Sequence, residues 1–239
     1  MSISLSPFDS DTALFNTGTG LFMITGLASG DVLVKPFCEG IEETVHLNVY
    51  TTPHGRNRII DIIGDLGGFA FEDYDSECEN SFANENGDRY ITCLNADLTL
   101  SDPEYIVATP RGNWTGKTKG GLILSKDCGS TWERLPMPRG LSEFIDQKLD
   151  NIEKPNVDSG WTAISADGKR IMWAVAGGRG FSNKAVCYTD DEGKTWQKSI
   201  FTDSSGNSAD EHNVKIFSDY YNSDLFFAIA ERENLGLYI

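Results

Sequence analysis

The sequence predicts an all-β fold, and two observations support this class. The apolar residues occur in short runs rich in Val, Ile, Tyr, Phe and Trp, separated by clusters of Gly, Asp, Asn and Pro, a pattern typical of strands joined by tight turns. Glycine supplies 24 of the 239 residues, about 10% against a usual ~7%. The expected strands lie at 13–15, 20–24, 45–50, 59–63, 105–108, 121–124, 170–175, 185–188 and 224–230. Only residues 141–149 predict a helical turn or two.

An internal repeat indicates which kind of all-β fold the chain adopts. Residues 125–132 and 189–196 both fit the pattern [S/T]-x-D-x-G-x-T-W, and each copy stands between two expected strands. In the first copy we expect Asp127 to accept main-chain N–H groups of the turn, Gly129 to take a positive φ, and Trp132 to cover the turn. The equivalent residues of the second copy are Asp191, Gly193 and Trp196. This is the Asp-box of β-propellers, where its role is structural.

A looser repeat of strand, turn, strand, glycine and strand runs through the whole chain. Its copies cover residues 4–24, 46–71, 94–125, 163–189 and 214–239. They predict about five blades of a probable seven, each typically of four strands, so that residues 1–239 form a single propeller domain or part of one. A ring of these blades alone would leave open edges. We therefore expect the chain to be part of something larger or to be closed by a second polypeptide.

Composition and charge exclude several classes of function. With 20 Lys and Arg against 36 Asp and Glu, the formal net charge is −16, which disfavours binding to nucleic acids and to anionic membranes. No stretch approaches about 18 apolar residues, and the first residues show no signal peptide. Neutral or cationic partners remain, with neutral sugars among them. The 39% of hydrophobic residues is enough for a packed core and argues against disorder.

Metal, cofactor and nucleophile chemistry find no support in the motifs. The three histidines and five cysteines are dispersed and lack metal-ligand spacing. We therefore expect buried or free thiols, or at most one disulfide bridge if the protein is exported. No G-x-S-x-G elbow and no phosphate-binding loop is present. The sequence therefore predicts neither a metal nor a cofactor.

A more specific set of motifs begins near the N-terminus. SPFDSDTALFNTGTGLFMI (6–24), GIEETVHLNVYTTP (40–53) and IIDIIGDLGGFAF (59–71) follow one another, and DPEYIV (102–107) comes later. This order resembles the C-terminal propeller of glycoside hydrolase family 74, the xyloglucan-active endo-β-1,4-glucanases. The resemblance implies two propellers with the substrate cleft between them, an inverting mechanism, and extracellular action on xyloglucan. It also implies that the general acid is Asp65, whereas the general base lies in an N-terminal propeller absent here, so this chain alone should be inactive.

The chemistry of inversion sets what Asp65 must do. A protonated carboxylic acid serves the leaving oxygen while a carboxylate roughly 6.5–9.5 Å away activates water, and the acid needs a raised pKa. Asp65 stands among apolar neighbours and the glycines Gly64, Gly67 and Gly68, which we expect to let a sugar chain approach the backbone. The alternative is an ordinary turn residue.

Sugar binding usually rests on aromatic faces with polar groups beside them. Trp114, in a Gly- and Lys-rich loop, is the best platform, and Phe69 and Tyr50 are near Asp65 in sequence. Glu42 is a candidate for a hydrogen bond to a sugar hydroxyl, although a solvated or structural role is the simpler interpretation. An alternative function is a non-catalytic Asp-box propeller that binds a glycan or a protein. The two hypotheses differ at Asp65, because only an enzyme needs it at the mouth of a cleft facing another carboxylate.

Overall fold

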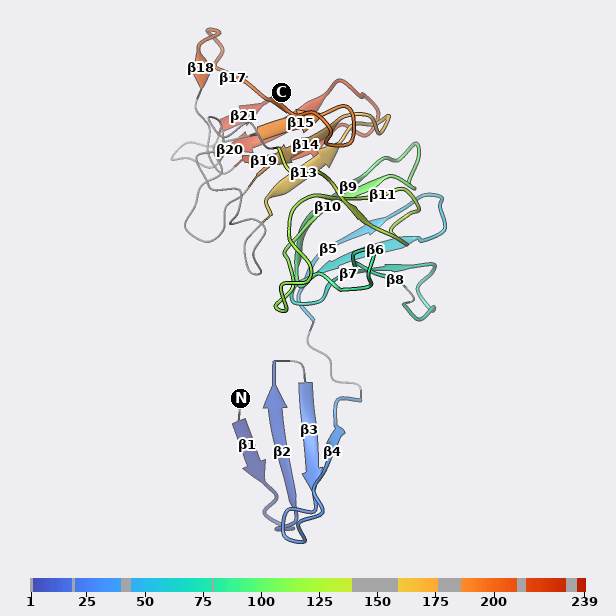
Figure 1. The fold of residues 1–239 in the computed structure, drawn as a ribbon, viewed down its shortest axis with the longest axis vertical. Coiled ribbons are helices and arrows are strands. Elements are labelled where there is room, and N and C mark those ends of the chain that lie inside the picture. The colour runs from blue at the N-terminus through green and yellow to red at the C-terminus, as the bar shows by residue number, and fades with distance from the viewer. Residues whose placement is uncertain are drawn as a thin grey trace. The chain divides into compact units, whose positions relative to one another are not determined.

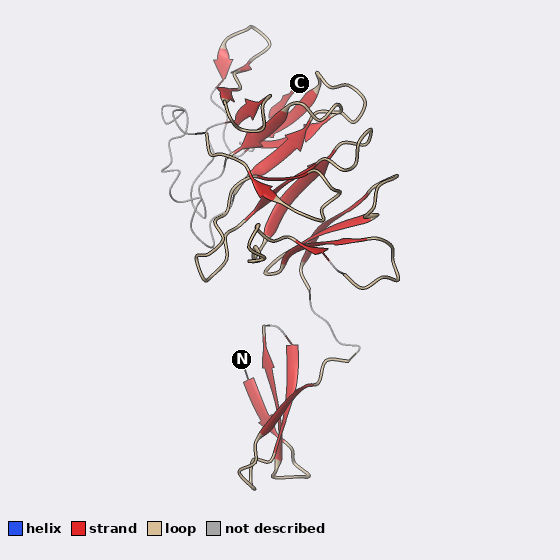
Figure 2. Cartoon of the chain, turned by 45° about the vertical axis from the view of Figure 1, so that its right-hand side comes forward, coloured by secondary structure: helices blue, strands red, loops and turns tan. Residues whose placement is uncertain are grey.

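The computed structural model is built from strands and turns (Figures 1 and 2). It describes residues 2–18, 20–39, 44–78, 80–138, 159–175, 186–209, 214–230 and 236–239. In these ranges there is no helix, and hence none long and apolar enough to cross a membrane; the predicted helical turn at 141–149 lies outside them. The chain divides into two compact units, Met1–Val45 (unit 1) and His46–Ile239 (unit 2).

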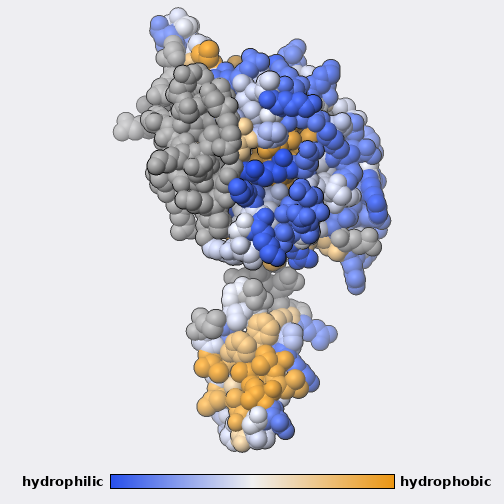
Figure 3. All heavy atoms as spheres, viewed as in Figure 1, coloured by the Kyte–Doolittle hydropathy of each residue, from blue (hydrophilic) through white to orange (hydrophobic). Residues whose placement is uncertain are grey.

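Unit 1 is one antiparallel sheet whose strands pair in chain order. The strands are β1 (Ser2–Leu5), β2 (Thr12–Thr17), β3 (Gly20–Thr25) and β4 (Leu33–Pro36). Apolar side chains gather over this sheet in Figure 3, and those of Ile3 and Leu5 are about two-thirds exposed. A single sheet this small cannot bury both of its faces.

Unit 2 contains three four-stranded sheets, each again in chain order. The first has β5 (His46–Thr51), β6 (Ile59–Ile63), β7 (Gly67–Phe71) and β8 (Asn80–Ser81). The second has β9 (Cys93–Leu98), β10 (Ile106–Pro110), β11 (Ile123–Ser125) and β12 (Glu133–Arg134). The third has β13 (Trp161–Ile164), β14 (Ile171–Ala174), β15 (Val186–Thr189) and β16 (Gln197–Lys198).

Two smaller sheets complete the described part of unit 2. A hairpin joins β17 (Phe201–Thr202) and β18 (Ser208–Ala209), and a three-stranded sheet contains β19 (Val214–Ser218), β20 (Phe226–Ala230) and β21 (Gly236–Tyr238). The three four-stranded sheets, the three-stranded sheet and the sheet of unit 1 are the five repeats that the sequence predicts. The all-β class and the propeller-type blades are confirmed.

The core of unit 2 lies between successive sheets. Ile60 and Phe82 of the first sheet region pack with Ile106 and Trp132 of the second, and the ring centroids of Phe82 and Trp132 are 4.3 Å apart. Two further clusters fill the next two spaces between sheets. Successive side chains of a strand point to opposite faces of its sheet. A sheet that lies between two others therefore buries apolar side chains on both faces.

The two repeated turns have the same hydrogen-bond pattern. Asp127 Oδ1 accepts the N–H of Thr131 at 2.8 Å, its Oδ2 accepts the Thr131 hydroxyl at 2.6 Å, and Gly129 has a φ of +83°. In the second turn Asp191 makes the same two bonds to Thr195 at 2.8 and 2.6 Å. Gly193 there has a φ of +81°. This is the pattern that the Asp-x-Gly spacing predicts.

Each of these turns is seated on the sheet before it. A Cβ on Gly129 would lie 3.1 Å from the side chain of Ile60 and 3.2 Å from that of Ala70. Trp132 is buried, and the indole N–H of Trp196 donates to the carbonyl of Pro136 at 3.0 Å. Tryptophan and glycine therefore serve packing between blades.

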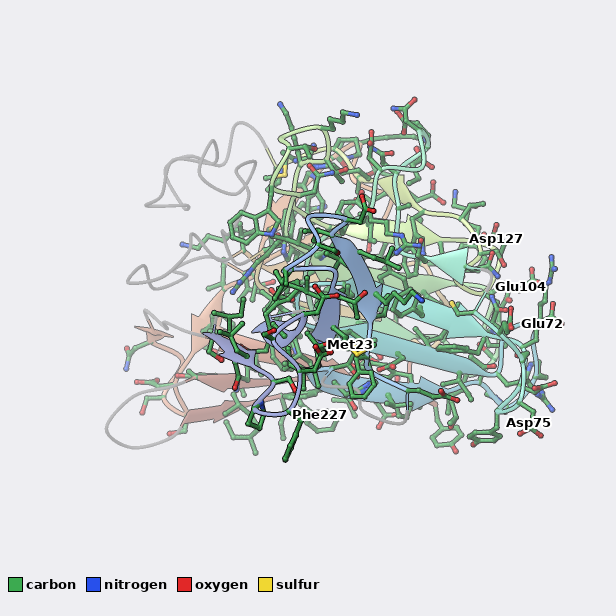
Figure 4. The ribbon with its side chains drawn as sticks, turned by 90° about the horizontal axis from the view of Figure 1, so that it is seen from below. Met23, Glu72, Asp75, Glu104, Asp127 and Phe227 are labelled. Atoms are coloured by element: carbon green, nitrogen blue, oxygen red, sulfur yellow. The ribbon has the colours of Figure 1, made fainter. Side chains whose placement is uncertain are left out.

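Strand order divides the first two sheets of unit 2 into two ends. Successive strands are antiparallel, so alternate connections meet at the same end of a blade. The Asp-box end carries residues 52–58, 72–78, 99–105 and 126–132, and the Asp65 end carries 64–66, 82–92 and 111–122. Figure 4 shows the labelled Glu72, Asp75, Glu104 and Asp127 along one edge, and the Asn57 amide donates to the Cys128 carbonyl at 2.8 Å across it.

Candidate functional site

Asp65 occupies the turn between β6 and β7. Its φ is +65°, in the left-handed region that costs a non-glycine residue about 1 kcal/mol, and its side chain is exposed. The N–H of Asp65 donates to the Thr92 hydroxyl at 3.0 Å. The turn is thus held by a side chain 27 residues further along the chain, and the carboxyl points out from a fixed main chain.

The glycines beside Asp65 have a different role from the one that the sequence predicts. A Cβ on Gly67, whose φ is +80°, would lie 2.7 Å from the Tyr90 carbonyl oxygen. A Cβ on Gly68 would lie 2.7 Å from the Asp61 carbonyl oxygen and 2.9 Å from the ring of Phe82. At these two positions the close approach is made by the protein itself, so the expectation that a sugar chain comes close there is wrong.

A buried segment connects Asp65 to the next blade. Thr92 is 5% exposed and pairs with Gly67 in a parallel bridge. Its carbonyl accepts the N–H of Arg111 at 2.7 Å, where the loop between β10 and β11 begins. The Asp65 turn and this loop are therefore neighbours on the same end of unit 2.

Trp114 lies three residues into that loop and is 64% exposed. The loop below it is well fixed: Asn113 accepts the N–H of Thr118 at 3.2 Å and donates to its hydroxyl at 2.9 Å. The same hydroxyl donates to the Asp88 carbonyl at 3.1 Å, which ties the loop to the segment before Thr92. An exposed indole on a rigid loop is the arrangement that a sugar-stacking platform needs.

Phe69 and Tyr50 do not join Asp65 at the turn. Tyr50 is opposite Ile60 in β6, at least three residues, or about 10 Å, along the strand from Asp65. It packs on the core. Burial raises its pKa to about 12, although hydrogen bonds with the Ala96 main chain and the Asn48 side chain act to lower it. Phe69 is half-buried two residues beyond Gly67, with Arg89 6.0 Å from its ring centre. Glu42 lies outside the described residues.

A buried carboxyl group with a half-exposed histidine beside it lies next to Phe69 and was missed in the sequence interpretation. Asp61, opposite Phe69 in the sheet, is 9% exposed at its side chain and lies 2.8 Å from Nδ1 of His46. The sequence signal for this contact was the aspartate inside the apolar run IIDII, because an aspartate is rarely buried without a hydrogen-bond or charge partner.

A second buried carboxylate lies on the inner strand of the next sheet. Asp97 on β9 accepts the N–H of Ile164 on β13 at 2.9 Å, the Ser218 hydroxyl at 2.7 Å and the N–H of Leu98 at 3.0 Å. Burial raises its pKa to about 6, although these hydrogen bonds oppose the rise. Asp97 joins three successive sheets, which is a structural task.

The carboxylates of the repeated turns are at the other end from Asp65. Hydrogen bonds from the side chain and N–H of Thr195 lower the pKa of Asp191 to about 2. Burial alone would raise the pKa of Asp127, but hydrogen bonds from Thr131 and Ser125 lower it. Both groups are therefore ionised turn residues. Within the described ranges, no group of three or more His, Cys, Asp or Glu residues could hold a metal ion.

Known proteins similar to this chain are xyloglucanases. The sequence is 25% identical over 234 residues to a xyloglucanase of a Paenibacillus species, a match covering 95% of this chain and 20% of that protein. It is 27% identical over 181 residues, 73% of this chain and 20% of the relative, to an oligoxyloglucan-reducing end-specific xyloglucanase of Emericella nidulans. No family model matches the sequence.

The structural comparison shows a shared fold. The family 74 xyloglucanase of Xanthomonas campestris matches with a TM-score of 0.66 and 22% identity, over 95% of this chain and 28% of that one. The chain spans about a fifth of the length of the curated relatives named above. Along nearly its whole length, this chain is similar to part of a glycoside hydrolase family 74 xyloglucanase, and the predicted resemblance is confirmed.

Proposed function

We propose that this chain contributes the general-acid half of an inverting glycoside hydrolase that cleaves the β-1,4-glucan backbone of xyloglucan. Asp65 donates the proton to the leaving oxygen, and a carboxylate on a partner propeller, in the same polypeptide or another, activates water on the opposite side of the sugar. The chain by itself is then inactive, because it supplies one of two required groups.

The observation that carries the proposal is the setting of Asp65. Its carboxyl is exposed on a turn fixed by Thr92, at the end of the blades opposite the two ionised Asp-box carboxylates. A general acid must be accessible to substrate and held in place. Docking of a partner and a glucan chain over Asp65 would exclude water from the acid.

We assign the sugar contacts to residues on this end of the unit. Trp114 is the stacking platform, since its indole is exposed on a loop tied to the segment before Thr92. Phe69, two residues beyond Gly67, is proposed to line the cleft on this end. Tyr50 packs on the core near the other end of β5, so we assign it support of the sheet and no sugar contact. For Glu42, a hydrogen bond to a sugar hydroxyl stays a proposal from the sequence alone. A xyloglucan-degrading enzyme meets its polymer outside the cell, so we propose that the whole protein is secreted.

The test compares Asp65→Asn with a matched control, Asp75→Asn. Asp75 is also an exposed turn aspartate, but it lies at the Asp-box end. Each variant is combined with the N-terminal propeller and assayed for reducing ends released from tamarind xyloglucan. We expect Asp65→Asn to abolish release, Asp75→Asn to keep it, and this chain without its partner to release none.

Two outcomes would decide against the proposal. Turnover by Asp65→Asn would show that another group is the acid. Binding of xyloglucan without any turnover, even with the partner propeller present, would favour the alternative of a non-catalytic glycan-binding propeller.

A further inference from the structure

We infer that Thr92 is a positioning residue for the reaction. It orients the Asp65 carboxyl and fixes its position relative to the loop that carries Trp114. This inference rests on the proposed function of Asp65. Thr92 touches neither sugar nor reacting atoms; it acts through the main chain of the turn.

The first step is the conformation of the turn. A left-handed φ is uncommon for a residue with a Cβ and persists where the surroundings impose it. At Asp65 the hydroxyl of Thr92 accepts the turn's N–H at 3.0 Å. On the other side, Gly67 is bridged to Thr92 and leaves no room for a Cβ beneath the Tyr90 carbonyl. The turn is therefore held from both sides by residues 90–92.

The second step is the burial of Thr92. At 5% exposure its hydroxyl is shielded from competing water, so the hydrogen bond to Asp65 is worth more than one at the surface. A β-branched side chain also has few rotamers to lose. Thr92 thus fixes its oxygen in space, and through it the position of the Asp65 backbone.

The third step is the link to the next blade. The carbonyl of Thr92 accepts the N–H of Arg111 at 2.7 Å, and the loop that starts there carries Trp114. One residue therefore bonds to the acid turn through its side chain and to the platform loop through its main chain. Proton donation requires the acid to meet the glycosidic oxygen of a sugar held elsewhere, so this shared anchor sets the geometry of the reaction.

The experiment replaces Thr92 by Val, which keeps the branched shape and removes the acceptor, and by Ser, which keeps the hydroxyl. Thr162→Val is the matched control, because Thr162 is also buried and its hydroxyl also bonds to the main chain, donating to the carbonyl of Met172 at 2.8 Å. All variants are assayed on xyloglucan with the N-terminal propeller present.

We expect Thr92→Val to lower kcat at least about tenfold while KM changes less than about twofold. Thr92→Ser and Thr162→Val should both stay within about twofold of wild type. In the chain alone, NMR should show amide exchange at Asp65 faster by about tenfold or more in Thr92→Val and close to wild type in Thr92→Ser.

The outcomes separate this inference from the proposed function. An active Asp65→Asn variant overturns both. An inactive Asp65→Asn together with wild-type kcat in Thr92→Val overturns the role of Thr92 alone. Equal loss in Thr92→Val and Thr92→Ser, or slow Asp65 exchange in Thr92→Val, also overturns it, because the hydroxyl would then not be what holds the turn.

Discussion

The buried carboxyl of Asp97 makes a specific prediction about stability and pH. It accepts hydrogen bonds from Ile164, Ser218 and Leu98, and so joins the inner strands of three sheets. Burial raises its folded-state pKa from 3.8 to about 6. The perturbation to make is Asp97→Asn, which removes the titration and keeps the size of the side chain.

The sign follows from linkage. Because the folded-state pKa is above the unfolded-state value, the protonated carboxyl favours folding below about pH 4, and this contribution is lost as pH rises through about 6. A pKa difference of about two units corresponds to about 3 kcal/mol at high pH. Between about pH 4.5 and about pH 7.5 the contribution of Asp97 to the free energy of unfolding should fall by about 2 kcal/mol.

The assay is urea denaturation of the wild-type chain and Asp97→Asn at those two pH values. Other carboxyl groups titrate in both proteins, so the quantity of interest is the difference between the two free energies of unfolding. We expect this difference to move by about 2 kcal/mol in favour of the variant as pH rises.

A donor variant supplies the control. Ser218→Ala removes a hydrogen bond that lowers the pKa of Asp97, so the pH-dependent change should shift to higher pH. The reasoning is refuted if Asp97→Asn and wild type have parallel pH profiles, or if wild type gains stability over the variant with rising pH.

Three further predictions concern the turns and the exposed loop. Gly67→Ala should lower the free energy of unfolding by at least about 1 kcal/mol in chemical denaturation, because its φ is positive and a Cβ meets the Tyr90 carbonyl; unchanged stability would contradict this packing. Trp114→Ala should weaken binding of a xyloglucan oligosaccharide about tenfold by calorimetry with an unchanged Tm, and a lower Tm would instead indicate a structural role. Asp191→Asn should lower Tm at neutral pH, and the deficit should vanish as pH falls toward 2, because the wild-type contribution is lost when Asp191, with its pKa near 2, is protonated; a deficit that persists in acid would point to packing.

The sequence was most informative where structure is local. The Asp-x-Gly turns could be predicted in detail because their hydrogen bonds are local: Asp127 accepts the N–H of Thr131, and Gly129 donates its N–H to the Ser125 hydroxyl, both four residues away. The division into five blades followed from a repeat that records one supersecondary unit per copy. For Asp65, a turn was only the alternative to a catalytic role, although the glycines on both sides are a local signal of a turn.

What escaped prediction depends on contacts between distant segments. The hydrogen bond between Thr92 and Asp65 joins residues 27 positions apart, and that between Asp97 and Ser218 joins residues 121 positions apart. No local sequence pattern predicts either bond. The expectation that a sugar approaches the glycines after Asp65 failed because the sequence does not show that atoms of Tyr90, Asp61 and Phe82 fill that space. The pair of His46 and Asp61 required knowledge of strand register.

Each repeated turn packs on the preceding sheet, so the stability of one blade is coupled to that of the blade before it. Gly129 rests against Ile60 and Ala70, and Gly193 rests against Leu135 and Pro136, so each of these two blades completes its outer turn only when its predecessor is folded. In such an array the free energy is carried at the junctions as much as within the units. Deleting one blade should therefore loosen the turn of the blade that follows it and spare the one before, which gives folding of this propeller a direction along the chain.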